Sequence, residues 1–502
     1  MKPLRSLAAL FACLTVLAGV AVAGCGSDDG SSSGLGTVLS FVPADTPFAV
    51  SIDTDLEGDQ YKSLDAILNR FPGADTIKAL LKARLTMGQE GVDFDKDIKP
   101  LLGNPAVISA TDITSFLSDT ADSGFVAALQ VKDTDALNSL VEKTKAKKLG
   151  DAAGATEYQD QDTFFAVKDD VVVLAGSRLL LEDALKRADG GDSLSEDDFN
   201  SALDGLPDSA LARVYVDVQG LLGQGEGAKA ARKIAWVDAL RKLGLTVSAH
   251  KDSIDVEFNL HTDAGSLSEK DLPLASGDEA AQVVQRPGEI GVGLRDPNQL
   301  VTFFESALQA VDPNTFGDYE QGKRALSAKL DLDVDKDLIA QLTGNLSVSA
   351  TIQGQFGIRA EVKDPAAFAQ TVDKVAKALP EFGSGLGVEG VRRSGDLYEA
   401  RLSGGGTFVF GMAGGALVAA TDSARAHALA SAKPAAVEGA SGSLVVRADA
   451  QGIARQILAR LAPQFGLPDP LVPVFARPFD ELLGSVATTT DGMKGKFSLT
   501  LD

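Results

Sequence analysis

Apolar residues recur along the chain at two different spacings, and together these predict a protein of both helices and strands. Between residues 365 and 379, apolar side chains lie three or four positions apart, which places them on one face of a helix. Asp364 and Pro365 stand where the N-cap and the first position of that helix would be. The apolar positions of this predicted helix are Phe368, Val372, Val375 and Leu379.

Other apolar runs are short and rich in β-branched and aromatic residues, which favours strands. Residues 164–167 and 171–174 are two such runs, and only the polar segment 168–170 separates them. So short a polar turn predicts an antiparallel hairpin. Helix-length patterns follow at 179–185 and, in the second part of the chain, at 424–430.

The same series of patterns occurs twice, about 240 residues apart. In each copy an acidic segment leads through a Gly-Asn pair to an apolar run, and a Lys-Asp pair then opens a helical pattern. The matching segments are 91–98 and 333–338, 106–111 and 346–351, 131–133 and 362–365, and 257–260 and 496–499. We therefore expect an α+β protein of two related halves, each a mainly antiparallel sheet covered by helices on one face. Whether the halves share one sheet is left open by the sequence.

The N-terminal residues follow the order of a secretory signal. Lys2 and Arg5 precede an apolar run at 7–23, and Val22-Ala23-Gly24 then stand directly before Cys25. This ending looks like a bacterial lipobox, in which signal peptidase recognises residues such as Val22, Ala23 and Gly24, and the thiol of Cys25 is acylated, for example with palmitate. The apolar run is shorter than the roughly 20 residues that a membrane-spanning helix needs. Cys25 is therefore the predicted lipidation site.

These patterns predict five segments. They are a lipoprotein signal peptide at 1–24, a lipidated flexible tether at 25–36, a first α+β repeat at 37–262, a connection at 263–287 and a second repeat at 288–502.

Composition excludes several classes of function. Loss of residues 1–24 removes two cations and changes the formal net charge from −23 to −25, which argues against a nucleic-acid partner and against electrostatic docking to anionic membranes. The chain has two cysteines, Cys13 in the signal segment and Cys25 at the predicted cleavage site. The mature body would thus have no cysteine for a disulfide, a thiolate metal site or a nucleophile.

Several of these segments resemble the bacterial extracytoplasmic proteins grouped as domain of unknown function family 3352. The run 41–50 resembles the opening strand of that family, and 95–103 resembles its acidic segment followed by Leu-Gly. The resemblance covers much of residues 37–262 and continues more loosely in the second half, without a clear counterpart of Ser193-Leu194. It implies no catalytic residue. The later segments that carry it are 193–199, 206–210 and 214–217.

Gly191-Asp192-Ser193-Leu194 matches the nucleophile block of one class of esterases, but the rest of that machinery is not evident. Those enzymes need a histidine three positions after an aspartate, and none of His250, His261 and His427 has one there. The residues that follow, 195–198, fit better as a loop that caps a helix. A hydrolase that uses Ser193 is therefore the third-ranked hypothesis.

No metal or cofactor signature is evident either. The alternating Asp331, Asp333, Asp335 and Asp337 lack the glycine and glutamate of a calcium loop, and helix capping explains them better. Three histidines are too few for the usual imidazole site unless His250 and His261 converge on adjacent strands. Gly288, Gly291 and Gly293 are not followed by a phosphate-binding pattern. We expect Trp236 in the core.

We therefore expect no enzymatic activity and no cofactor. The predicted function is that of a lipid-anchored envelope protein on the extracytoplasmic face of the cell membrane, in binding or assembly with an envelope protein partner. The alternative is a carrier of lipid or another apolar ligand, because the aliphatic, aromatic-poor composition could line a groove.

Overall fold

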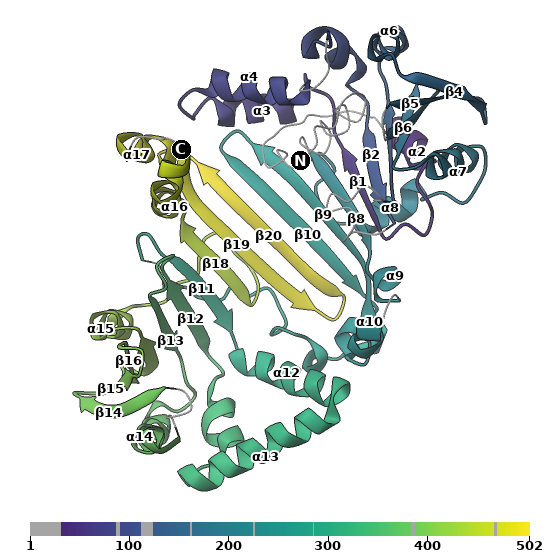
Figure 1. The fold of residues 1–502 in the computed structure, drawn as a ribbon. Coiled ribbons are helices and arrows are strands. Elements are labelled where there is room, and N and C mark those ends of the chain that lie inside the picture. The colour runs from purple at the N-terminus through teal and green to yellow at the C-terminus, as the bar shows by residue number, and fades with distance from the viewer. Residues whose placement is uncertain are drawn as a thin grey trace. The chain divides into compact units, whose positions relative to one another are not determined.

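The computed structural model describes residues 32–86, 91–111, 124–160, 163–223, 226–284, 286–382, 387–465 and 469–502. It is an α+β protein built on antiparallel strand pairs (Figure 1). The described chain divides into two compact units. Unit 1 comprises residues 32–223, 241–261 and 500–502, and unit 2 comprises residues 226–240 and 262–499.

Unit 1 contains an antiparallel sheet in the order β10-β9-β8-β1-β2-β3-β7-β6-β5-β4. Its central strand is β1, in which Val50 lies opposite Ile108 of β2 and Val214 of β8. The strands are β1 (Phe48–Ile52), β2 (Ala106–Ala110), β3 (Phe125–Gln130), β4 (Lys147–Ala152), β5 (Ala155–Asp160), β6 (Thr163–Lys168), β7 (Val171–Ala175), β8 (Ala212–Asp217), β9 (Leu240–His250) and β10 (Ser253–Thr262).

The helices of unit 1 pack on both faces of this sheet. Leu181 and Leu185 of α7 join a core with alternate residues of β2 and β3, while Leu137 and Leu140 of α6 join a core with the residues between them. The prediction of helices on one face is therefore wrong, because central strands with apolar residues on both faces need cover on both. The helices are α2 (Ser32–Leu39), α3 (Asp59–Leu68), α4 (Ala74–Leu85), the π-helix η1 (Phe94–Ile98), the 3-10 helix η2 (Lys99–Leu101), α6 (Thr134–Thr144), α7 (Arg178–Ala188), α8 (Glu196–Ala202) and α9 (Val218–Leu222).

Unit 2 has an antiparallel sheet in the order β20-β19-β18-β11-β12-β13-β17-β16-β15-β14. Here β11 is central, and Val292 lies opposite Val348 of β12 and Val446 of β18. The strands are β11 (Ile290–Arg295), β12 (Asn345–Ala350), β13 (Phe356–Ala360), β14 (Val388–Ser394), β15 (Leu397–Leu402), β16 (Thr407–Ala413), β17 (Ala416–Ala420), β18 (Leu444–Asp449), β19 (Phe479–Thr489) and β20 (Gly492–Leu501).

Helices lie on both faces of this sheet as well. Phe368 and Val372 of α14 pack with residues of β15 and β16 on one face, and Ala426 and Leu429 of α15 pack on the other. The helices of unit 2 are α10 (Glu226–Ala231), α11 (Ala235–Ala239), η3 (Ala264–Ser266), η4 (Glu269–Asp271), α12 (Pro297–Val311), α13 (Pro313–Leu330), η5 (Val334–Leu338), η6 (Ile339–Gln341), α14 (Pro365–Phe382), α15 (Ser423–Ser431), α16 (Ala450–Phe465), η8 (Asp469–Leu471) and α17 (Val472–Ala476).

Several local predictions are confirmed. The polar turn 168–170 joins β6 to β7 in an antiparallel hairpin. Asp364 caps α14, because its Oδ1 accepts the N–H groups of Ala366 and Ala367 at 3.1 and 3.0 Å. The run 41–50 is not one strand, since β1 begins only at Phe48. Pro43 and Pro47 lack the N–H that a paired strand uses, which explains the late start.

Candidate functional site

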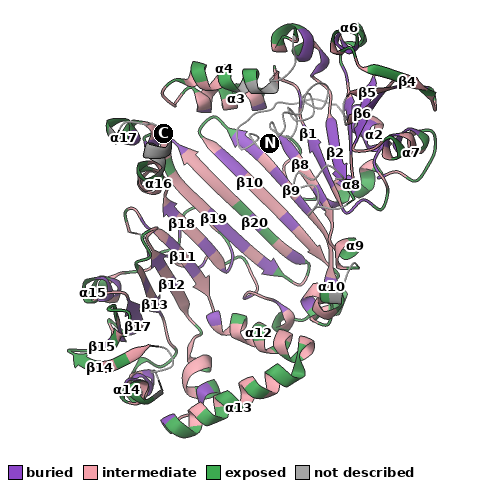
Figure 2. Ribbon diagram, in the orientation of Figure 1, coloured by how far each residue is buried: buried purple, intermediate pink, exposed green. Residues whose placement is uncertain are grey.

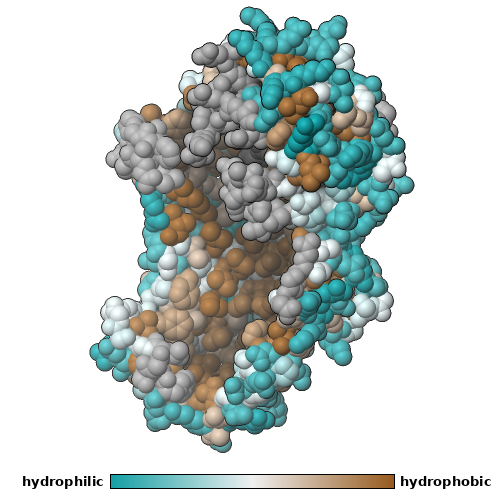
Figure 3. Space-filling view, turned by 45° about the vertical axis from the view of Figure 1, so that its right-hand side comes forward, coloured by the Kyte–Doolittle hydropathy of each residue, from teal (hydrophilic) through white to brown (hydrophobic). Residues whose placement is uncertain are grey.

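One face of the unit 2 sheet is aliphatic and incompletely covered. The register places alternate residues of four neighbouring strands side by side on this face, and they carry no polar side chain. Most are only half-buried. Figure 3 shows hydrophobic residues together on the lower part of the surface. We call this set the open sheet face. Its residues are Ile290, Val292 and Leu294 of β11, Leu346, Val348 and Ala350 of β12, Leu444 and Val446 of β18, and Leu482 of β19.

The strands at the same place in the unit 1 sheet are covered. Val50, Ile52 and Ile108 of β1 and β2 are buried in a core that also holds Ile98 and Leu101 from η1 and η2. In Figure 2, β1 and β2 are coloured mainly as buried. In unit 2 the short helix η5 has one buried residue, Val334, and η6 has none. The exposed Thr343 follows them where Leu102 is buried in unit 1. The helices η5 and η6 thus cover the sheet of unit 2 less completely than η1 and η2 cover the sheet of unit 1, which leaves the open sheet face accessible.

Helix α12 presents a second apolar surface in unit 2. Leu300 and Phe304, one turn apart, are 44% and 52% exposed although the helix is rich in apolar residues. Its polar side is held firmly, because Glu305 accepts a hydrogen bond from Lys323 of α13 at 2.8 Å. These two side chains form a small exposed apolar surface on an anchored helix.

Lys323 is the centre of that anchor. Its side chain is 11% exposed and its ammonium lies 2.8 Å from Glu305, 2.6 Å from Glu320 and 2.8 Å from Asp335. Burial alone would lower the pKa of Lys323, but hydrogen bonds to Asp335, Glu305 and Glu320 outweigh it and raise this pKa. The ammonium therefore stays charged and ties α12, α13 and η5 together.

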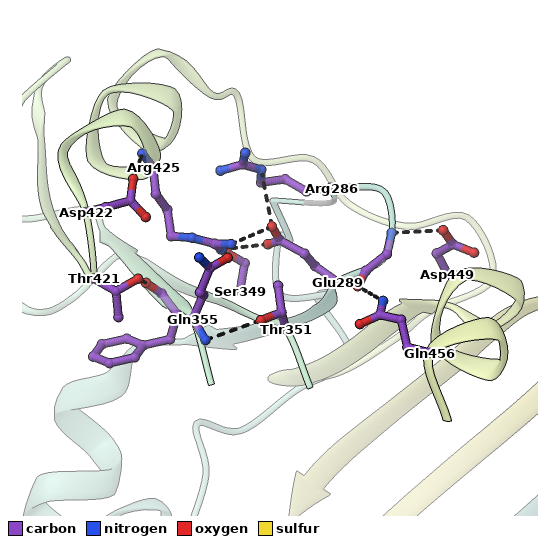
Figure 4. Close-up of polar contacts among 12 residues, drawn as sticks. Arg286, Glu289, Ser349, Thr351, Gln355, Thr421, Asp422, Arg425, Asp449 and Gln456 are labelled. Atoms are coloured by element: carbon purple, nitrogen blue, oxygen red, sulfur yellow. Dashed lines mark hydrogen bonds and ion pairs between the residues drawn. The ribbon is translucent and has the colours of Figure 1, made fainter. Parts of the chain in front are cut away.

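On the opposite face of the sheet, α15 is held by a buried ion pair (Figure 4). Nη1 and Nη2 of Arg425 donate to the two carboxylate oxygens of Glu289, each at 2.9 Å, and both residues are buried. Nη1 also lies 3.4 Å from Oγ of Ser349, and Arg286 approaches Glu289 at 3.6 Å. Gly357 makes this packing possible, because a Cβ there would lie 2.3 Å from Leu429 of α15. The pair thus holds α15 on one face while the other face stays open.

The predicted lipidation residues lie outside the described part of the chain. Val22, Ala23, Gly24 and Cys25 all fall there, so the structure leaves the lipobox as a prediction. Within the described residues, no helix is both long enough and apolar enough to cross a membrane.

Ser193 lies in an isolated bridge with Pro43, and the following Ser195 caps α8, its Oγ accepting the N–H of Asp198 at 3.0 Å. This confirms the capping role predicted for residues 195–198. In unit 2 the corresponding bridge joins Val283 to Ala435, so a backbone counterpart of the Ser193 segment exists although its sequence differs.

His250 and His261 have separate partners. His250 faces Asp255 at 3.6 Å, whereas Nε2 of His261 lies 2.9 Å from the carbonyl of Ala202. In the described ranges, no group of three or more His, Cys, Asp or Glu residues could hold a metal ion.

Capping is confirmed for Asp333, whose Oδ1 accepts two backbone N–H groups at 3.1 Å. Trp236 is 5% exposed, as expected of a core residue. Gly291 and Gly293 are explained by packing, because a Cβ at either would meet residues 282–284 at 2.6 Å or less. The sequence did not single out the open sheet face, since its half-buried residues look like any other strand residues.

The comparisons with known proteins point to one family. No curated protein matches the sequence. Among solved structures, crystal form III of TP0453 aligns at 12% identity over 45% of this chain and 79% of that chain, with a TM-score of 0.26. Crystal form IV of TP0453 aligns at 11% identity over 45% and 80%, again with a TM-score of 0.26. These scores are too low to establish a shared fold. The profile of the proteins of unknown function DUF3352 matches residues 6–382, about three quarters of the chain and far into unit 2. The chain therefore belongs to the DUF3352 family.

Proposed function

We propose that the chain is a non-catalytic lipoprotein of the cell envelope that binds a lipid or another apolar molecule on unit 2. Acylated Cys25 would hold it at the extracytoplasmic face of the cell membrane. The support for this location is the N-terminal order of Lys2, Arg5, the apolar run 7–23 and the small residues before Cys25. One or two acyl chains would suffice as an anchor, at about 0.8 kcal/mol per buried methylene.

We further propose that the chain consists of two related halves. The support is that both units have the same strand order around a central strand, β1 in one and β11 in the other. Equivalent lysine–aspartate pairs also recur, since Lys82 contacts Asp95 at 2.8 Å and Lys323 contacts Asp335 at 2.8 Å. Duplication would free one half to change its surface while the other keeps a closed core.

The open sheet face is the observation that carries the binding function. Its aliphatic side chains offer contact area without hydrogen-bond donors or acceptors, and the strand backbones beneath it are already paired. A polypeptide laid there would gain no backbone hydrogen bonds, whereas an acyl chain needs none. Covering about 250 Å² of such surface would contribute roughly 6 kcal/mol before the cost of ordering the ligand.

The ligand is tested by purification of the mature protein without detergent, followed by solvent extraction and mass spectrometry, and by titration with a fluorescent fatty acid. We expect Val446→Asn on the open sheet face to weaken fatty-acid binding. Val214→Asn is the matched control, because Val214 has the same place beside Val50 that Val446 has beside Val292. A protein that neither carries nor takes up lipid, or equal binding by both variants, would contradict the proposal and favour a protein partner instead.

The anchor is tested separately by labelling cells with an alkyne palmitate. Cys25→Ser should abolish the label and release the protein from membranes. Persistence of label and membrane association in that variant would refute the anchor without bearing on the apolar ligand.

A further inference from the structure

Unit 1 contains a polar cleft of about 530 Å³ that the lipid-binding proposal does not use. Three connections line it: the loop from β1 to α3, the helices η1 and η2, and the loop from β3 to α6. Its volume lies within the range of small-molecule sites. In unit 2 the first of these connections is a single residue, Asp296, between β11 and α12. The loop 53–58 therefore has six residues where unit 2 has one.

The loop 53–58 is fixed by its own hydrogen bonds. The hydroxyl of the fully buried Thr54 donates to the carbonyl of Asn104 at 2.5 Å and accepts the N–H of Gly103 at 2.9 Å. Oδ1 of Asp53 accepts the N–H of Asp55 at 2.9 Å, and the hydroxyl of Tyr61 donates to the carbonyl of Asp53 at 3.1 Å. The cleft is thus preformed, which lowers the cost of binding a ligand.

The ammonium group of Lys132 is the positive charge in this cleft that is available to a ligand. Its stem passes over Gly103, where an added Cβ would lie 2.9 Å from Cδ and 3.4 Å from Nζ of Lys132. Gly103 has a φ of +131°, a backbone conformation that favours glycine. No side chain in the described ranges pairs with the ammonium of Lys132, whereas Lys99 in the same cleft is paired with Glu57 at 3.2 Å.

Two carboxylates of the lining are likewise without a cation among the described residues. Asp55 accepts the N–H of Glu57 at 3.1 Å, and Oδ1 of Asp133 accepts two N–H groups at the start of α6. A third, Asp95, is paired with Lys82 at 2.8 Å. The charges still available in the cleft are therefore one ammonium and two carboxylates.

We propose that this cleft binds a zwitterionic ligand of the amino-acid type, with its carboxylate on Lys132 and its ammonium on Asp55 and Asp133. A ligand with both charges matches the available groups, whereas a simple anion would meet the carboxylates and a simple cation would meet Lys132. Each contact is a charge-assisted hydrogen bond, the stronger class of such bonds. The two sources of this chemistry are a free amino acid and the ends of a short peptide.

The proposal is tested by calorimetric titration of the purified full chain with L-alanine and with L-alanyl-L-alanine. Each probe is also used with its ammonium acetylated and with its carboxylate amidated. We expect one unblocked probe to bind and either block to weaken it at least about tenfold. Tighter binding of alanine would identify the free amino acid as the source, and tighter binding of the dipeptide would identify a peptide. No binding up to ~10 mM, or blocked probes that bind equally well, would overturn the proposal.

The chain offers a matched pair of variants for the same titration. Lys132→Met should weaken binding at least about tenfold, whereas Lys363→Met, at the equivalent Lys-Asp pair of unit 2, should leave it unchanged. Lys132 is exposed, so we expect thermal unfolding to be unaffected. Equal effects of the two substitutions would show that the binding is not in this cleft. Retained fatty-acid binding by Lys132→Met would separate this site from the open sheet face.

Discussion

The ion pair between Arg425 and Glu289 gives the sharpest test of how unit 2 is held together. Glu289→Gln replaces the buried carboxylate by a neutral amide of nearly the same shape. Both carboxylate oxygens accept from Arg425 at 2.9 Å, and an amide can accept on only one side and would present an N–H to the guanidinium on the other. The substitution therefore leaves a buried cation without a counter-charge.

The expected cost follows from burial. Both side chains are less than a tenth exposed, and removing one partner of such a pair typically costs about 3–5 kcal/mol. Ser349 still accepts from Arg425 at 3.4 Å, which places our expectation near the lower end, at about 3 kcal/mol. Replacing both partners, as in Arg425→Met with Glu289→Met, should cost much less, because no charge is then left buried.

Trp236 makes this measurable. It is the only tryptophan of the chain, it is 5% exposed, and it belongs to the residues of unit 2, so its fluorescence follows that unit in urea. Glu399→Gln is the matched control, since the pair of Glu399 with Arg392 at 2.7 Å is largely exposed on the arginine side and should cost less than about 1 kcal/mol. Equal losses for the two glutamine variants would refute the reasoning.

Three further predictions concern other parts of the fold. Burial raises the pKa of Asp53 from 3.8 to about 6, so the contribution of Asp53 to stability is full below pH 4 and is lost as pH rises through 6. Asp53→Asn should flatten this pH dependence and stabilise the protein at pH 7.5 by ~2–3 kcal/mol. Calorimetric unfolding at several pH values would reveal or disprove this effect. Lys323→Met leaves three carboxylates together and should destabilise the contact between α12 and α13 by ~1–2 kcal/mol. We expect faster amide hydrogen exchange confined to these helices, and unchanged exchange would argue against the anchor. Gly442→Ala places a Cβ 2.3 Å from a carbonyl oxygen at a φ of +86° and should lower the free energy of unfolding by over ~2 kcal/mol. Gly439→Ala, with a φ of +79° and open space around the Cβ, should lower it by ~1 kcal/mol. Similar losses of stability in the two variants would mean that only the backbone conformation matters.

The sequence predicted the elements better than their packing. Local patterns were sufficient for α14, where an N-cap, a proline and an apolar stripe all agree, and for the β6–β7 hairpin, where a short polar turn leaves little choice. Local patterns were insufficient to predict which faces of the sheet are covered by helices, because an apolar strand has the same sequence pattern whether helices lie on one face or on both. Leu346 and Ala106, at equivalent places in β12 and β2, illustrate this: one is half-buried and the other fully buried. The difference arises from residues outside the strand, such as Leu101 of η2, whose packing the pattern of the strand itself does not reveal.

The two units differ at the same structural position, and this has a consequence for function. In unit 1 the connection after the central strand is long and forms a polar cleft, while η1 and η2 cover the sheet beside it. In unit 2 the connection is one residue, and η5 and η6 cover the sheet less completely. Unit 1 thus exposes charges at this position, and unit 2 exposes aliphatic side chains. If the units descend from a common ancestor, the segment between the central strand and β2 or β12 is where their binding properties diverged, and exchanging that segment between units should exchange the ligands.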